Sequence, residues 1–94
     1  MNIETTRWDI TEHLGTAAEV KAYLEAVFED SDPDEVRRAL GHVARARGMT
    51  EVAQGAGITR AGLYKALGEG GNPSFATVAA IAKAVGVKLT VSAA

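Results

Sequence analysis

The sequence has 94 residues, 47% hydrophobic and 23% charged, a balance typical of one globular domain. It contains no cysteine, which excludes disulfides, thiolate metal sites and cysteine nucleophiles, and two histidines are too few for a histidine-rich metal site. No apolar run approaches the roughly 18 residues that span a bilayer. The opening MNIETTRWDI has no basic stretch followed by an apolar one, so we expect a cytoplasmic protein without a secretory signal.

The formal net charge of −2 is unevenly distributed. Residues 1–35 carry ten acidic and two basic side chains, a net charge of −8, whereas residues 36–94 carry eight basic and two acidic ones, a net charge of +6. This contrast suggests a cationic partner for the acidic part and a polyanionic partner for the basic part. A solvated dipolar surface without any partner would give the same pattern. We expect a single domain over residues 1–94 with these two parts.

The first half of the chain predicts two helices after a short extended segment around Trp8. Thr16-Ala17-Ala18-Glu19 fits a capping box and predicts a helix over residues 17–30. Asp32-Pro33 supplies an N-cap and a residue suited to the first helical position, so a second helix follows and ends at Gly48.

The second half predicts three shorter helices, each preceded by a hydroxyl residue that can cap it. The last of these has apolar residues at helical spacing from Phe75 to Val85 and ends at Gly86. The expected caps are Thr50 for residues 51–56, Thr59 for residues 60–67, and Ser74 for the last helix.

Apolar and polar residues alternate from Val87 to Ser92, which predicts a short C-terminal strand with one buried face. Because an unpaired strand edge is rarely left free, we expect pairing either with the segment around Trp8 or with the same strand of a second chain.

Two very short helices meet at Gly57 with almost no loop between them. Such helices cross closely, and the small Ala53, four residues before Gly57, permits the approach. Gly57 itself can supply the left-handed backbone of the turn. The pattern predicts a helix-turn-helix, and an ordinary antiparallel helical hairpin is the alternative.

In a helix-turn-helix the second helix enters the major groove of DNA, so residues 60–67 would be the recognition helix. Arg60 is the best candidate for a bidentate contact to guanine, and Ala61 can touch a thymine methyl group. Thr50, Asn72 and Ser74 are expected to meet the DNA backbone. The full set of expected DNA-binding residues is Thr50, Thr59, Arg60, Ala61, Tyr64, Lys65, Asn72 and Ser74.

Catalytic and ligand sites are not expected. Gly68-Glu69-Gly70-Gly71 lacks the Lys-Ser/Thr of a phosphate-binding loop, and no nucleophile–base pair is evident. The sequence therefore predicts no enzyme, no cofactor and no metal.

Several segments together resemble a known family. GMTEVAQGAGITRAGLYKAL resembles the helix-turn-helix of Cro/C1-type (Xre) regulators. With WDITEHL, YLEAVFEDSDP, ALGHVARARGMT and GNPSFATVAAIAKAVGVKLTV, the chain is similar over residues 7–91 to the HigA-like addiction-module antidote proteins of bacteria. Glu51, where glutamine is frequent, and the glycine-rich stretch from Gly68 to Gly71 depart mildly from the family pattern.

The resemblance implies an all-α, five-helix, lambda-repressor-like domain with the short C-terminal strand. It also implies an antitoxin that neutralises a small basic toxin of the RelE/HigB type and represses its own operon. The partners would be double-stranded operator DNA and the toxin, with no membrane. Because one such domain buries too little DNA for tight specific binding, we also expect a homodimer that reads two half-sites. A stand-alone Cro/C1-type repressor is the first alternative, and an adaptor whose helix-turn-helix no longer binds DNA is the second.

Overall fold

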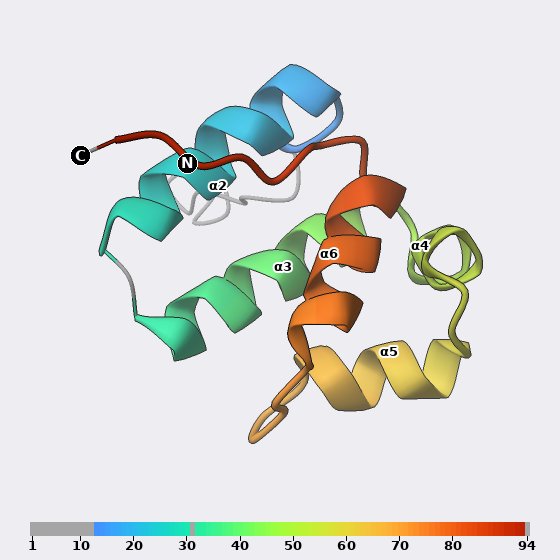
Figure 1. Ribbon diagram of the computed structural model, residues 1–94. Helices are drawn as coiled ribbons and strands as arrows, with labels where there is room; N and C mark the ends of the chain where they lie inside the picture. Colours follow the sequence, from blue (N-terminus) through green and yellow to red (C-terminus); the bar gives the residue numbers. More distant parts are fainter. Residues whose placement is uncertain (1–12, 31, 94) are drawn as a thin grey trace, which may run out of the picture.

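The computed structural model describes residues 13–30 and 32–93, and within them the fold is all-helical. Five helices of these described residues surround one hydrophobic core (Figure 1). This confirms the predicted all-α class. The helices are α2 (Ala17–Asp30), α3 (Pro33–Arg47), α4 (Met49–Ala56), α5 (Arg60–Leu67) and α6 (Phe75–Ala84).

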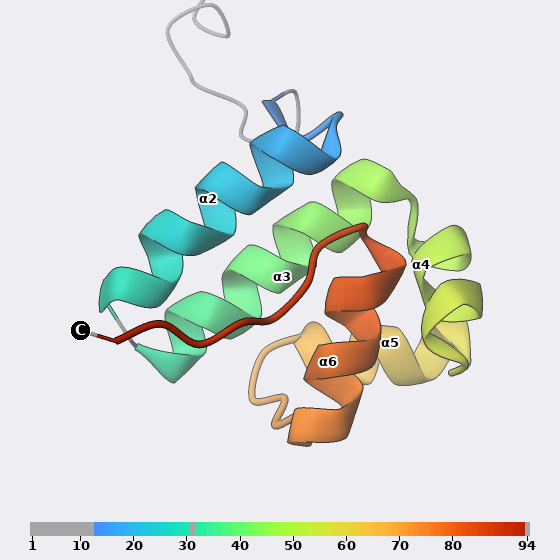
Figure 2. The same cartoon turned by 45° about the horizontal axis from the view of Figure 1, so that its top comes forward.

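Helix α3 lies at the centre of the arrangement. It packs against α2 on one side and against α4 and α5 on the other, and α6 packs on α4 (Figure 2). The approach of α4 to α6 depends on small residues, since a Cβ built at Gly55 would lie 3.0 Å from the Cβ of Ala84. The largest fully buried side chains are Leu14, Leu40, Leu63, Ile81, Val20, Val43, Val52 and Val85.

Local hydrogen bonds explain where the first two helices begin. The Glu19 N–H donates to the Thr16 hydroxyl at 3.1 Å, and the Thr16 N–H donates to the Glu19 carboxylate at 3.1 Å, which confirms the capping box. The Asp34 N–H donates to the Asp32 carboxylate at 2.9 Å, which confirms Asp32 as the N-cap of α3.

The prediction that Thr50 caps the next helix is wrong. Helix α4 begins at Met49, so its N-cap is Gly48, and no side chain caps it. Gly48 is also the C-cap of α3 and has φ of 102°, a backbone angle that glycine adopts readily. One glycine therefore ends α3 and starts α4, which leaves Thr50 inside the first turn.

The predicted C-terminal strand is also wrong for the described residues. Residues 87–93 are extended but belong to no strand. They turn back from the end of α6 and run alongside α2 (Figures 1 and 2). An alternating sequence favours an extended backbone, but a strand also requires a hydrogen-bonded neighbour, and the described helices offer none. The segment around Trp8, the other expected partner, lies outside the described residues.

The prediction that no segment spans a membrane can be compared with the described helices. None of the helices in residues 13–30 and 32–93 is long and apolar enough to cross a bilayer.

Candidate functional site

Helices α4 and α5 are joined by a tight turn at Gly57. Gly57 has φ of 73° and ψ of 27°, the left-handed conformation expected from the sequence. Its N–H donates to the Gln54 carbonyl at 3.2 Å, and the Ile58 N–H donates to the Ala53 carbonyl at 3.0 Å. These two bonds form a Schellman motif that ends α4 and redirects the chain. The two helices then cross steeply instead of running antiparallel (Figure 1).

Helix α5 divides into an inner and an outer face. Leu63 and Leu67 are buried in the core, and Ala66 is half-buried beside them. The outer face carries four of the predicted site residues, all exposed. These four residues are Arg60, Ala61, Tyr64 and Lys65. The sequence therefore placed the two faces of this helix correctly, because hydrophobic spacing sets which side is buried.

Arg60 and Tyr64 are paired along the outer face, a contact that was not predicted from the sequence. The Arg60 Nη2 donates to the Tyr64 hydroxyl at 3.2 Å, and the guanidinium carbon lies 5.2 Å from the centre of the tyrosine ring. The spacing of four residues could have predicted this contact, since such residues are neighbours on a helix. The guanidinium is thus held against a flat aromatic surface at the start of α5.

The capping hydroxyls have structural roles at the edges of this face. Thr59 accepts a hydrogen bond from the Gly62 N–H at 2.9 Å and Ser74 accepts one from the Thr77 N–H at 3.1 Å, so both predicted caps are confirmed. The Ser74 hydroxyl also donates to the Thr77 hydroxyl at 3.0 Å. Asn72 and Thr50 are exposed.

Gly62, an unusual residue inside a helix of this kind, lies against the cap of α5. A Cβ built at Gly62 would be 3.0 Å from the Thr59 hydroxyl oxygen. The absence of a side chain therefore leaves room for the capping group.

Arg37 has a structural role that the sequence pattern did not predict. It lies on α3 and is only 8% exposed. Its Nη1 donates to the Leu67 carbonyl at 3.3 Å and to the Gly68 carbonyl, both at the end of α5. Its Nη2 lies 3.7 Å from the Asp34 carboxylate. The burial of Arg37 could have been predicted, because Arg37 precedes the buried Leu40 by three positions and so lies on the same face of α3.

The glycine-rich stretch after α5 forms a compact turn. The Gly71 N–H donates to the Gly68 carbonyl at 2.8 Å. A Cβ at Gly68 would lie 2.8 Å from the Tyr64 carbonyl oxygen, and one at Gly71 would overlap the Ala66 carbonyl oxygen. Side chains are therefore excluded at both positions by the end of α5.

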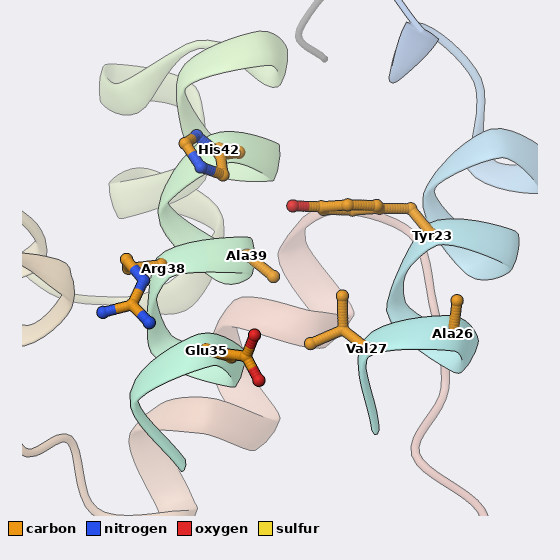
Figure 3. Close-up of a pocket in the computed structure, with 7 residues that line it drawn as sticks. All are labelled: Tyr23, Ala26, Val27, Glu35, Arg38, Ala39 and His42. Atoms are coloured by element: carbon orange, nitrogen blue, oxygen red, sulfur yellow. The ribbon is translucent and has the colours of Figure 1, made fainter. Parts of the chain in front are cut away.

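A hollow of about 340 Å³ lies away from α5, between α2 and α3 (Figure 3). The Tyr23 hydroxyl points from α2 toward α3, above Val27 and Ala39 (Figure 3). Burial raises the pKa of Tyr23. Burial lowers the pKa of His42, with smaller contributions from the positive charges of Arg45 and Arg38.

Acidic side chains gather where α2 meets α3. Glu29, Asp32, Asp34 and Glu35 are all exposed there, on the part of the chain that the sequence assigns a charge of −8. No group of three or more histidine, aspartate or glutamate side chains among the described residues is arranged to hold a metal ion. The described acidic residues thus form a charged surface, which we call the acidic turn.

The chain is similar in sequence to a protein family and to a bacterial relative. A family model described as "Probable addiction module antidote protein" matches residues 4–93. An uncharacterized protein of Haemophilus influenzae is 43% identical over 84 residues, which cover 89% of this chain and 87% of the relative. No solved structure matches the chain at a significant level. The match over almost the whole length shows that the chain belongs to the family of probable addiction module antidote proteins.

Proposed function

We propose that this protein is the antitoxin of a type II toxin–antitoxin module, and that it neutralises a small basic toxin of the RelE/HigB type. We further propose that it represses its own operon through a lambda-repressor-like, Cro/C1-type helix-turn-helix. Membership of an antidote family supports the first role, because an antidote in an addiction module counteracts a toxin. In this proposal the chain is not an enzyme and acts by binding alone.

The outer face of α5 carries the DNA-binding proposal. It combines an arginine, a tyrosine and a lysine on an exposed helix whose start is held by the turn at Gly57. Arginine suits the acceptor pair of guanine, and lysine suits phosphate. In the free protein Arg60 contacts Tyr64, so its guanidinium already lies on the outer face of α5. In this proposal Thr50, Thr59, Ala61, Asn72 and Ser74 make secondary contacts with the DNA.

An electrophoretic mobility shift with the promoter upstream of the gene tests this role. We expect Arg60→Ala to weaken specific binding by about 10- to 100-fold, the range of a lost bidentate base contact of about 1–3 kcal/mol. Arg38→Ala removes the same charge from an exposed position on α3 and serves as the matched control. Equal losses in the two variants would contradict a recognition role for α5.

The acidic turn carries the toxin-binding proposal. Toxins that cleave RNA bind a polyanion and are expected to be basic, so exposed carboxylates would attract them and accelerate association. The described acidic turn lies at the junction of α2 and α3 (Figure 1).

Toxin binding can be measured with the product of the adjacent gene by co-expression and stopped-flow association. The double variant Glu29→Gln/Glu35→Gln should slow association at low salt and reduce its dependence on ionic strength. Glu51→Gln/Glu69→Gln removes two carboxylates elsewhere and should leave the rate unchanged. An identical rate for both double variants would sink the acidic-turn proposal.

A stand-alone repressor is the alternative function. In that case the chain alone shifts its promoter in a salt-dependent manner, and the neighbouring gene product neither binds it nor inhibits growth. The adaptor alternative predicts no specific shift at all.

A further inference from the structure

The hollow between α2 and α3 is lined by polar groups that the outer face of α5 does not use. The Tyr23 hydroxyl points from α2 toward α3, and the Glu35 carboxylate points from α3 toward Val27 of α2 (Figure 3). Neither the hydroxyl nor the carboxylate has a hydrogen-bond or ion-pair partner among the described residues. Two oxygen acceptors on facing helices are therefore available to a partner in the same space.

The other walls of the hollow include apolar side chains. Val27 is partly buried against the core, Ala39 is buried, and Ala26 lines the hollow from α2. The volume of about 340 Å³ is near the lower end of the range for small-ligand pockets, so it has room for one long side chain. Apolar walls beside oxygen acceptors suit a side chain with an aliphatic stem and a charged, hydrogen-bond-donating end.

The charges that line the hollow favour a cation there. Burial lowers the pKa of His42 below 6.5, and the His42 Nδ1 accepts a hydrogen bond from the Arg45 Nη2 at 3.3 Å, so the ring is neutral at pH 7. The Arg38 guanidinium points away from α2, whereas the Glu35 carboxylate points into the space between the helices (Figure 3). Glu35 also belongs to the acidic turn, so a basic partner that is attracted to this turn meets the hollow.

We propose that this hollow receives one arginine side chain of the toxin and so anchors the complex. The inference rests on the proposed antitoxin function and adds a specific contact to the general attraction of the acidic turn. In this arrangement the guanidinium donates to the Glu35 carboxylate and to the Tyr23 hydroxyl, while its methylene groups pack on Val27 and Ala39. Arginine is favoured over lysine because its planar group has five donors and is more weakly hydrated than an ammonium group.

An anchoring contact and a general attraction affect different rates. Charges that attract a basic partner raise the association rate, whereas groups that hold a side chain in a pocket lower the dissociation rate. Tyr23 is uncharged at neutral pH, since burial raises its pKa above the ordinary value of 10.0. Its hydroxyl cannot attract a distant cation, so its effect on dissociation reports on the hollow alone.

Surface plasmon resonance with the product of the adjacent gene tests the hollow. We expect Tyr23→Phe to raise the dissociation rate by about 2- to 10-fold, the effect of one lost neutral hydrogen bond, and Glu35→Gln by about 10- to 100-fold. Glu29→Gln is the matched control, because it removes the same charge from the acidic turn but does not line the hollow. It should slow association and leave the dissociation rate unchanged. Circular dichroism should show the same helix content in all three variants.

Double-mutant cycles identify the side chain that fills the hollow. Each arginine of the partner is changed to glutamine in turn, and each complex is measured with the wild-type chain and with Glu35→Gln. For one partner arginine the two dissociation rates should be equal, because the contact has already been lost. Partners with a lysine changed to glutamine should retain the full effect of Glu35→Gln.

Three results would overturn this inference. If the complex forms and dissociates equally fast with the wild type, Tyr23→Phe and Glu35→Gln, the hollow is outside the interface and the antitoxin function stands. If Glu35 is coupled to a lysine, or to none of the partner's arginines, the occupant is wrong. If the adjacent gene product forms no complex with the chain at all, the proposed function fails and this inference fails with it.

Discussion

Arg37 illustrates how one side chain outside a helix can fix the position of that helix. It belongs to α3, yet its guanidinium reaches the last carbonyls of α5 while a carboxylate of the acidic turn lies on its other side. Carbonyls at a helix end lack partners within the helix, so a cation there satisfies them and opposes the helix dipole. The orientation of the outer face of α5 therefore depends on a residue that never reaches that face.

Replacing Arg37 by methionine should lower the free energy of unfolding by about 2 kcal/mol, since it removes the donors to the end of α5. Arg38→Met, on the neighbouring exposed residue, should change it by less than about 0.5 kcal/mol. Urea denaturation followed by circular dichroism measures both values. If the two variants unfold at the same urea concentration, Arg37 does not anchor α5.

His42 makes stability depend on pH. Because its pKa is lowered in the folded protein, the unfolded chain takes up a proton more readily than the folded chain as the pH falls through the ordinary value near 6.5. The contribution of His42 to stability is therefore fully present above that value and is lost as the pH falls through its folded pKa. Between pH 7.5 and 5.5, His42→Gln should lose less stability than the wild type. Denaturation curves of the two proteins at both pH values measure the difference.

At the scale of elements, α4 and α5 begin in different ways although a threonine lies near the start of each. Thr59 accepts the Gly62 N–H, whereas Thr50 lies within the first turn of α4 and caps nothing. A short helix such as α5 depends strongly on its ends, because few internal hydrogen bonds support it.

Thr59→Ala should therefore destabilise the protein by about 1 kcal/mol, the usual value of a lost N-cap. Thr50→Ala is the same chemical change at an exposed threonine and should stay within about 0.5 kcal/mol. Thermal or urea unfolding of the two variants gives a direct comparison. A larger loss for Thr50→Ala would show that the start of α4 is not as the structure has it.

At the scale of the whole molecule, acidic and basic side chains come from different segments of the chain. The described acidic turn is formed where α2 meets α3, while Arg60 and Lys65 lie on the outer face of α5. Because the total charge is only −2, binding to DNA would depend on a local basic surface and not on the net charge.

A local basic surface makes DNA binding depend on salt. Lys65→Ala should reduce the slope of log affinity against log salt concentration by about 1, the effect of one lost phosphate contact. Lys83→Ala, in the last turn of α6, should leave the slope unchanged. Fluorescence anisotropy at several salt concentrations supplies the slopes, and equal slopes for the two variants would argue against a phosphate contact at Lys65.

The sequence by itself determined the features that depend on neighbouring residues. The capping groups at Thr16, Asp32, Thr59 and Ser74 act within three positions, and Gly57 adopts the left-handed turn through its own backbone. The two faces of α5 follow from helical spacing alone. The helical class was predictable for this reason.

Only the tertiary structure decided the features that join distant residues. The burial of Arg37 depends on where α5 ends, thirty positions later in the chain. Phe75 has helical spacing with Val78 but is exposed, because the first turn of α6 extends past the core. The alternation from Val87 to Ser92 predicted an extended backbone correctly and a strand wrongly. Backbone conformation is a local preference, whereas a strand exists only where another backbone lies beside it.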